Sequence, residues 1–474
     1  MKQESKSISN AAVNAYAAAA TFQSYAIHIP DTYLSIFMTT YLGITAAMMA
    51  TVYLVSMTLD IILSLLAGGL IDIVKFKKGK YLPWLNFFRW FVMFGAVGQF
   101  IDTSKLSLAV RMIVISVCYI TMHGSMNFMS TAQNGIIAAI GGFNMEDRIR
   151  LTTRRAQVSA AGTIILSFST LPLITFFGRL SGNEAGGYTI VCAIYCLALV
   201  LGTTILTRYT REYDEQASSA APEKKYSVKD MWDAIAGNDQ MIVYAVSQLV
   251  RQVGMLIVGG MGMYYWKLIM DKYQYYSVSS GITTFVGFLF SLFNPSIGRK
   301  MGKIKAMKLS IGLGAVLYIA LRYTGLKSIW FMTAFSVVSS AFNYLTAGFG
   351  INYYLDIGEY GYYKTGRDYR TLCVSMSNIL MKIGRLIGRS LSGYVLAWIG
   401  FDRFNQMMLD GVIDRTSPDF TRFADLFMDI YCFVPLVTRI IGLVILAGYK
   451  IKDEDAVFYA RENARREAGE ARQG

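Results

Sequence analysis

The chain has 474 residues, of which 54% are hydrophobic and only 16% are charged, and its mean hydropathy is +0.40. A soluble domain carries about 25% charged residues, so this composition argues against a soluble enzyme and indicates a polytopic membrane protein. The net charge of +14 does not indicate nucleic-acid binding, because Lys and Arg gather in the cytoplasmic loops of membrane proteins.

Apolar runs recur along nearly the whole length, and a spanning helix needs about 20 mostly apolar residues. The sequence therefore predicts an all-α membrane protein with twelve transmembrane helices in two six-helix halves. The expected spans are 14–40, 45–71, 83–101, 107–138, 156–177, 187–207, 239–267, 276–297, 306–323, 328–355, 372–399 and 425–449. Residues 1–10 are mostly polar and no cleavage site follows a short apolar core, so no signal peptide is expected.

An even number of spans places both termini on the same side of the membrane. The segments that then share this side are 73–81, 142–155, 208–238, 298–308, 357–371 and 450–474. They carry roughly 27 Lys and Arg against about 7 in the opposite loops, which by the positive-inside rule puts both termini in the cytoplasm. We therefore expect a multi-pass protein of a bacterial cytoplasmic (inner) membrane.

The segment 208–238 is the one long charged interruption between the spans. It separates an N-terminal half, 1–207, from a C-terminal half, 239–449, and leaves a charged cytoplasmic tail, 450–474, expected to be a solvated helix or a frayed end. Two halves joined by a central cytoplasmic loop indicate a transporter with a site between them at mid-membrane. Gly- and Lys-rich loops follow the second and eighth spans, an echo that ordinary cytoplasmic loop composition also explains.

Charged residues within the expected spans each cost at least about 2.5–3.5 kcal/mol and need a partner, water or a function. The clearest are Asp31, Asp60, Arg111, Arg251, Lys382, Arg385 and Arg389, with Asp356 and Glu359 near the end of the tenth span. Asp60 and Ser64 share a helix face. A carboxylate with a hydroxyl one turn away suits a small cation or a transferable proton, and a structural ion pair is the alternative.

Lys382, Arg385 and Arg389 follow one another at i, i+3 and i+7 and form one stripe of the eleventh span. They either pair with carboxylates of other spans or line a cavity that accepts an anion. Asp31, three residues after His28, can serve the same cavity, although a lone His is more often a packing residue. The two His and five scattered Cys give no metal or redox motif, so neither a metal ligand nor a cofactor is expected.

The stretch YLDIGEYGYYKTGRDYRTL, residues 354–372, resembles the end of the tenth helix and the following loop of the glycoside–pentoside–hexuronide:cation symporters. This family is the melibiose permease-like branch of the major facilitator superfamily. The matching positions are Asp356, Gly358, Glu359, Lys364, Thr365, Gly366 and Arg367. Lys382 then falls where the family places its lysine of the eleventh helix.

The N-terminal half shows the same resemblance over two further motifs, and the likeness runs from about Asn14 to Ile451. The positions that match the second helix and its loop are Asp60, Gly68, Asp72, Gly79, Lys80, Tyr81, Pro83 and Trp84, and those after the fourth helix are Asp147, Arg148, Leu151 and Arg155. The resemblance implies solute:cation symport by alternating access. It also implies that Asp60 belongs to the cation site and that Lys382 and Arg155 lie near the central cavity. The motif residues expected to act in gating at the cytoplasmic side are Asp72, Gly79, Lys80, Arg148, Asp356, Glu359 and Lys364.

Departures from the family pattern bear on the chemistry. Many members carry a second aspartate where this chain has Ser64, and hard cations take several oxygens, so a proton, or no coupling at all, is favoured over sodium. The sugar-binding aspartates of the family align with Ser24 and Thr131, so its galactoside specificity is not carried over. Gln133 and Asn134 are polar neighbours that can supply hydrogen bonds instead.

The loss of acidic ligands and the gain of arginines in the eleventh span make the expected cavity more positive. This suits a hexuronide, because a guanidinium group pairs with a carboxylate in a fork geometry. The candidate substrate-binding residues are therefore Ser24, Asp31, Thr131, Gln133, Asn134, Arg155, Arg385 and Arg389, and the candidate cation-coupling residues are Asp60, Ser64 and Lys382.

The sequence thus predicts a cation-coupled symporter of a glycoside, oligosaccharide or hexuronide. The expected partners are a small sugar or sugar acid and the lipid bilayer, with no nucleic acid, and a monomer is expected. The coupling ion is expected to be a proton, with sodium as the alternative. The rival interpretations are an uncoupled facilitator, a non-transporting sensor of the same fold, and a membrane-embedded transferase, for which the loops offer no catalytic motif.

Overall fold

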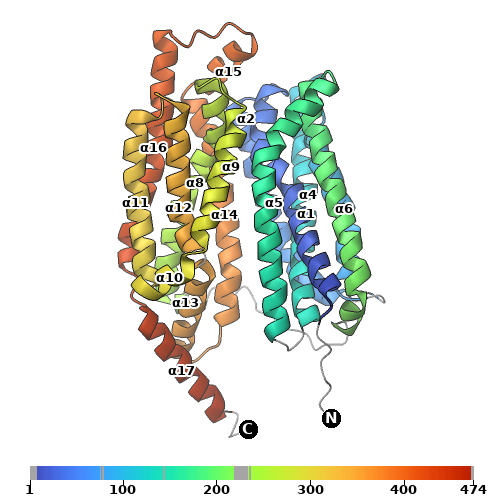
Figure 1. Cartoon of the computed structure of the whole chain (residues 1–474), viewed down its shortest axis with the longest axis vertical. Helices are drawn as coiled ribbons and strands as arrows, with labels where there is room; N and C mark the ends of the chain where they lie inside the picture. The colour runs from blue at the N-terminus through green and yellow to red at the C-terminus, as the bar shows by residue number, and fades with distance from the viewer. Residues whose placement is uncertain are drawn as a thin grey trace. The chain divides into compact units, whose positions relative to one another are not determined.

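The computed structural model describes residues 8–74, 76, 79–141, 145–217, 233, 236–347 and 349–470. The chain divides into two compact helical units, Met1–Glu223 and Lys224–Gly474 (Figure 1). The division falls inside the expected loop 208–238, much of which lies outside the described residues, and the expected domain boundaries stay predictions. The side chains of Asp72 and Arg148 also lie outside the described part of the structure.

The first unit is built from long helices that begin at polar caps. Its helices are α1 (Asn10–Thr40), α2 (Ala46–Ile73), α3 (Leu82–Gly98), α4 (Leu108–Gly141), α5 (Met145–Leu180) and α6 (Glu184–Ala217). Ser9 and Thr45 accept hydrogen bonds from backbone N–H groups in the first turns of α1 and α2 and so satisfy donors that a helix start leaves open. α1 packs against both α5 and α6, while α4 packs against α2 and α3.

The second unit adds shorter helices to the same plan. Its helices are α8 (Asp239–Tyr264), which continues into the π-helix η1 (Tyr265–Ile269), α9 (Tyr275–Ser291), α10 (Asn294–Met301), α11 (Lys303–Thr324), α12 (Ile329–Ala347), α13 (Gly350–Thr365), α14 (Arg370–Trp398), α15 (Phe401–Leu409), α16 (Pro418–Ala447) and α17 (Asp453–Glu470). α8 packs against α14 and α16, and α11 packs against α12 and α16. Asn238 caps α8 by accepting from the N–H of Met241 at 3.1 Å.

Each of the twelve expected spans coincides, within the described residues, with one helix or with two consecutive helices. Within the part of the chain that the structure describes, seven helices are long and apolar enough to cross a membrane by length and hydropathy. The eighth expected span is divided between α9 and α10, where Pro295 stands in the first turn of α10 and favours a new helix start. The tenth is divided between α12 and α13, around Phe349.

In both units, a glycine with positive φ and a carboxylate from a distant segment stabilise one loop. In the first unit, Gly79 has φ +105° and the Asp214 carboxylate at the end of α6 accepts from the N–H groups of Tyr81 at 2.8 Å and Leu82 at 3.0 Å. In the second, Gly302 has φ +79°, and Asp453 accepts from the N–H of Lys303 at 3.0 Å. A carboxylate at the end of α6 thus caps α3 in the first unit, and one at the start of α17 caps α11 in the second.

Arg111 lies in the first turn of α4, next to a loop and near the start of the expected span 107–138. Its guanidinium donates to three backbone carbonyls, those of Leu42 at 2.6 Å, Ser104 at 2.5 Å and Leu106 at 2.8 Å. Arg111 therefore ties the α1–α2 turn to the α3–α4 loop. Its charge has a structural role that hydrogen bonds to carbonyls explain.

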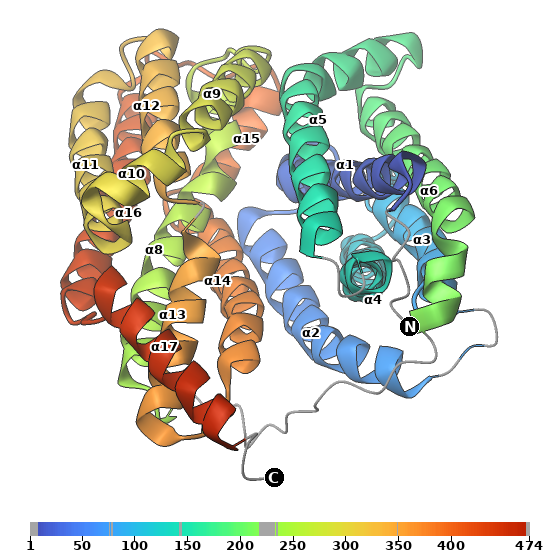
Figure 2. The same ribbon diagram turned by 60° about the horizontal axis from the view of Figure 1, so that its bottom comes forward.

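The C-terminal tail is a helix with mostly exposed residues, as one of the two expected alternatives had it, and it also packs through a buried face. α17 runs across α13 (Figure 2). Asn463 is fully buried and donates to the backbone and side-chain oxygens of Glu359 at 2.9 and 2.7 Å, while Glu467 pairs with Arg370. The tail is therefore part of the second unit.

Candidate functional site

The carboxylate of Asp60 on α2 is bound by one residue of α4. Asn127 donates from Nδ2 to Asp60 Oδ1 at 2.7 Å, and Asp60 is half-buried. Ser64, one turn further along α2, donates its hydroxyl to the backbone oxygen of Ile61 at 2.8 Å. Among the described residues, no group of three or more His, Cys, Asp and Glu side chains gathers as a metal site. Sequence reasoning found Asp60 by its charge but gave no signal for Asn127.

Arg155 on α5 is tied to α1. Its Nη1 donates to the hydroxyl of Tyr16 at 3.2 Å, and its guanidinium carbon lies 6.0 Å from the centre of the Tyr16 ring. The two preceding basic positions on the same helix also reach α1, because Arg154 donates to Asn14 at 2.9 Å and Arg150 donates to Asn10 and to the backbone oxygen of Ile8. Amides on α1 and arginines on α5 thus form a polar ladder between the two helices.

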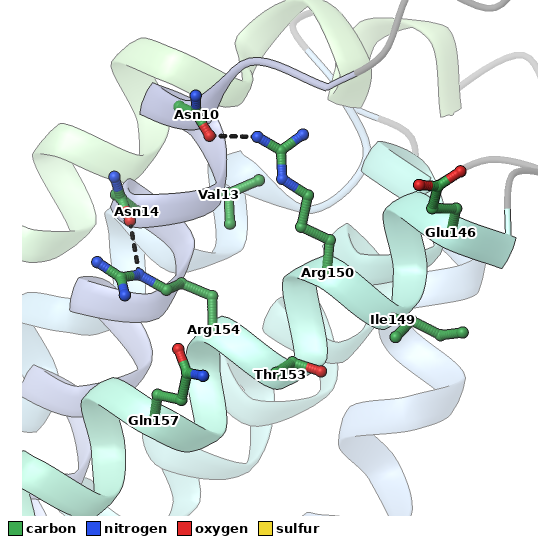
Figure 3. Close-up of a pocket in the computed structure, with 9 residues that line it drawn as sticks. All are labelled: Asn10, Val13, Asn14, Glu146, Ile149, Arg150, Thr153, Arg154 and Gln157. Atoms are coloured by element: carbon green, nitrogen blue, oxygen red, sulfur yellow. Dashed lines mark hydrogen bonds between the residues drawn. The ribbon is translucent and has the colours of Figure 1, made fainter.

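A pocket of about 550 Å³ lies along this ladder (Figure 3). The side chains that line it come from the first turns of α1 and the first three turns of α5, and they are Asn10, Val13, Asn14, Glu146, Ile149, Arg150, Thr153, Arg154 and Gln157. Ligand pockets of about 300–1,000 Å³ are typical of small molecules, and the amide, hydroxyl and guanidinium donors suit a ligand rich in oxygen. None of the expected substrate-binding residues lines it. The i, i+4 pairs Asn10 and Asn14, and Arg150 and Arg154, are the sequence signal that could have predicted this pocket.

The other expected ligands of the first unit are dispersed over α1 and α4. The hydroxyls of Ser24 and Thr131 donate to backbone oxygens of their own helices, at 3.2 and 2.9 Å, and both residues are exposed. Gln133 is buried, Asn134 is exposed and Asp31 is half-buried. None of these side chains lines the pocket between α1 and α5.

Gln23, which the sequence analysis did not single out, connects α1 to α4. Its side chain is buried and donates from Nε2 to the hydroxyl of Ser130 at 3.0 Å and to the sulfur of Met126 at 3.0 Å. It stands directly before the expected ligand Ser24. A buried amide that joins two helices holds their relative register, so Gln23 is a positioning residue for the polar positions of α4.

The cationic stripe of α14 lies on a face other than the one packed on α8. Gly384 and Gly388 make the contact with α8, since an added Cβ would stand 2.8 Å from the side chain of Gln252 and 2.5 Å from that of Leu256. Within the stripe, Arg385 is exposed, while Lys382 and Arg389 are half-buried.

The expected gating motif of the second unit forms ion pairs within that unit. Lys303 pairs with Asp356 and lies 3.5 Å from Asp453, which joins α11, α13 and the start of α17. Glu359 lies 3.3 Å from the guanidinium of Arg370.

Lys364 pairs with Asp239 at 2.6 Å and connects the end of α13 to the start of α8. The hydrogen bond with the Asp239 carboxylate raises the pKa of Lys364 above its ordinary value. The charges of this motif therefore fasten α13 to its neighbours α8, α11, α14 and α17.

The corresponding loop of the first unit is fastened by a residue that the motif does not include. A Cβ added to Gly79 would stand 2.1 Å from Oδ2 of Asp214, so the loop accepts only glycine there. The ammonium of Lys80 lies 5.1 Å from the centre of the Tyr81 ring. Asp72 and Arg148 have helical backbone, and their side chains lie outside the described structure.

Comparison with solved structures shows that known transporters share this fold. A bacterial homologue of the lysosomal transporter Spinster matches with a TM-score of 0.65 at 11% identity over 92% of this chain and 95% of its own. A D-xylose-proton symporter matches with a TM-score of 0.64 at 12% identity over 93% of this chain and 97% of its own.

The chain belongs to the MFS/sugar transport protein family, whose model matches residues 15–453. It is 25% identical to the putative glycoside/cation symporter YagG of Escherichia coli, over 89% of this chain and 87% of that protein. It is also 25% identical to the isoprimeverose transporter of Lactiplantibacillus pentosus, over 78% of this chain and 76% of that protein. A lactose permease of Leuconostoc lactis is 24% identical, and the chain spans 62% of its length. These proteins are membrane transporters and not enzymes.

Proposed function

We propose that this protein is a proton-coupled symporter of a sugar or sugar acid. Membership of a sugar transport family, with relatives named for glycosides, isoprimeverose and lactose, supports a sugar as the solute. The observation that carries the coupling is the Asp60–Asn127 pair, a half-buried carboxylate with a neutral donor as its hydrogen-bond partner.

A proton suits Asp60 better than sodium does. A hard cation takes several oxygen ligands, whereas a proton needs a single carboxylate. Asn127 turns its amide nitrogen toward Asp60, and the Ser64 hydroxyl proton is engaged with its own helix. In our proposal Asp60 loads the proton and Lys382 modulates it electrostatically, while alternation of the two halves moves the site from one side of the membrane to the other.

We infer that the solute passes the pocket between α1 and α5. Arg154, which lines the pocket, precedes Arg155 in the chain. The polar lining suits sugar hydroxyls or a carboxylate. A Gln157→Trp substitution, which fills the pocket, is expected to lower uptake at least about tenfold while leaving the protein folded. Thr152→Trp, an exposed position of α5 outside the lining, is the matched control, and equal uptake by the two variants would remove the pocket from the pathway.

The test of the proposed function is uptake into proteoliposomes that contain the purified protein. A labelled glucuronide and a labelled neutral galactoside are offered separately, each with an inward proton gradient or an inward sodium gradient. Proton-driven accumulation of either solute supports the proposal, and preference for the glucuronide supports the role of Arg385 and Arg389. Sodium-driven accumulation would overturn the choice of ion.

An uncoupled facilitator is the second candidate, and Ser64, at the position where the resembled family often carries a second aspartate, favours it. Such a protein equilibrates the solute at the same rate with and without a gradient. The same vesicles therefore decide between the two, since only a symporter raises the internal concentration above the external one. We also propose that both termini face the cytoplasm, on the charge bias of the loops.

A further inference from the structure

Two arginines lie inside the second unit, far from the ends of the helices that carry them. Arg251 is twelve residues into α8, and Arg439 is eight residues before the end of α16, which correspond to about 18 and 12 Å along the helix axes. These two helix ends lie together, because the N–H of Lys450 donates to the side chain of Gln240 at 2.6 Å. Both guanidinium groups are therefore within the expected spans.

The two arginines interact electrostatically and lie within one turn of each other along α16. A Cβ added to Gly442 would stand 2.5 Å from the Arg251 side chain, so Arg251 rests on α16 one turn away from Arg439. Ser247 holds the helices at this point by donating to the backbone oxygen of Gly442 at 2.7 Å. A Cβ on Gly314 of α11 would likewise stand 2.5 Å from Arg439 Nη1. Two glycines thus make room for two like charges that repel each other.

Among the residues that the structure describes, neither guanidinium pairs with a carboxylate. Arg251 donates to the backbone oxygen of Ser247 at 3.2 Å, and Arg439 donates to the amide oxygen of Asn343 at 3.3 Å and lies 5.6 Å from the centre of the Tyr318 ring.

Other cations of the same unit differ in this respect. Lys303 pairs with Asp356, and Arg322 pairs with Asp429 at 2.5 Å and with Asp425 at 3.3 Å. A buried charge without a counter-ion is costly, so the contrast calls for an acceptor.

The surroundings of Arg251 are rich in tyrosine, and the carboxylates within electrostatic reach of Tyr353, those of Asp356 and Asp453, both pair with Lys303. Tyr244, Tyr353 and Tyr354 lie within electrostatic reach of it, and the rings of Tyr353 and Tyr354 lie 5.0 and 5.1 Å from that of Tyr244. The hydroxyls of Tyr353 and Tyr449 are buried and have no hydrogen-bond partner in the described structure. The hydroxyl of Tyr354 is engaged by the side chain of Gln248. Of the two unengaged hydroxyls, that of Tyr353 belongs to a residue within electrostatic reach of Arg251 and adds a donor to the two cations.

We infer that Arg251 and Arg439 form an anion site inside the second unit, which takes a single carboxylate or an ion of similar size. The source of the negative group is either a free small anion or the carboxylate of the transported sugar acid. The second source rests on the proposed function, and the first does not. Arg251 and Arg439 thereby become residues that select for negative charge.

The test is anion binding to the purified full-length protein in nanodiscs, with no gradient present. The thermal midpoint is followed as chloride, formate or glucuronate replaces a bulky sulfonate at constant ionic strength, with a neutral methyl galactoside as the uncharged probe. A saturable rise with all three anions identifies a free-anion site, and a rise with glucuronate alone identifies the carboxylate of the solute. Either result supports the inference, and no saturable rise with any of them overturns it.

Variants locate the site. Arg251→Gln and Arg439→Gln are each expected to weaken anion binding at least tenfold, whereas Arg403→Gln, at an exposed arginine paired with Asp419, is expected to leave it unchanged. If a glutamine variant does not fold, Arg251→Lys and Arg439→Lys keep the charge and are expected to weaken binding several-fold. Binding that is unaltered in the variants at both positions overturns the inference. Proton-driven uptake of a neutral glycoside with no anion binding would leave the proposed function standing and remove this inference alone.

Discussion

At the scale of single residues, the polar side chains of the first unit divide into those that hold helices together and those that remain available for a solute or ion. Asp60 is our candidate for the second group, because it is half-buried and accepts a hydrogen bond from the neutral amide of Asn127 at 2.7 Å. Asp214 belongs to the first, because backbone N–H groups engage both of its carboxylate oxygens. The sequence analysis recognised Asp60 by its charge within a span. It missed Asp214, whose role depends on a contact between distant parts of the chain.

Replacement of Asp60 by Asn is expected to abolish accumulation of the solute against its gradient, a loss of about tenfold or more, because the amide cannot carry the proton. Exchange of labelled for unlabelled solute should persist, since it needs no net proton movement. Ser64→Ala is the matched control, and its uptake should stay close to that of the wild type. Full accumulation by the Asp60 variant would exclude this carboxylate from coupling, and a comparable loss in the Ser64 variant would favour sodium.

A Gly79→Ala substitution is expected to destabilise the first unit by about 1–3 kcal/mol, because alanine must adopt a positive φ and meet the Asp214 carboxylate. Gly69→Ala on α2, where an added Cβ meets nothing within 4 Å, should instead be neutral or stabilising by up to about 1 kcal/mol. Thermal unfolding of the two purified variants measures the difference. An unchanged midpoint for Gly79→Ala would show that the loop can rearrange.

At the scale of elements, the charged side chains of α13 hold this helix against its neighbours. Asp356, Glu359 and Lys364 each pair with a different helix, and α17 covers α13 by means of the buried Asn463. The sequence analysis treated these positions as one motif because they match a family pattern within one short stretch of the chain. The structure distributes them among several contacts, since successive residues of a helix point in different directions.

Asn463→Ala is expected to weaken the docking of α17 by about 1–3 kcal/mol, because it leaves the Glu359 acceptors without their donor. Hydrogen–deuterium exchange of the backbone amides of α17 should then accelerate by about tenfold or more, as a change of that size in opening free energy requires. Arg465→Ala, which removes only an exposed pair with Glu462, is the control and should leave exchange unchanged. Equal protection in the two variants would mean that other contacts hold the tail.

At the scale of the whole molecule, hydropathy was sufficient to locate the membrane-spanning helices, because lipid selects for apolar length irrespective of side-chain pairing. It could not place the breaks at Pro295 and Phe349, where local backbone preferences divide an apolar run. It also gave no sign of the pocket between α1 and α5, since Asn10 and Arg154 are far apart in sequence. The candidate ligands of the two halves remain predictions, because hydropathy does not indicate which residues distant in sequence come together.

Orientation is a property of the whole chain, and the expected arrangement places both termini in the cytoplasm. In a variant without the five native cysteines, a membrane-impermeant maleimide should label Thr416→Cys in intact cells. Arg465→Cys should be labelled only after the membrane is opened. The native cysteines are buried or half-buried, which makes their removal tolerable. The reverse labelling pattern would invert the topology.

The Asp214 cap also bears on how the first unit is made. The loop at Gly79 and the start of α3 leave the ribosome more than a hundred residues before the carboxylate that caps them. At about 5–20 residues per second, α3 waits for some 7 to 25 seconds before its cap is synthesised. The start of α3 must therefore lack these hydrogen bonds during membrane insertion until the end of α6 is synthesised. Synthesis of the end of α6 therefore also completes the start of α3. A nascent chain arrested before Asp214 should hold an open loop, and a chain arrested after Asp214 should not.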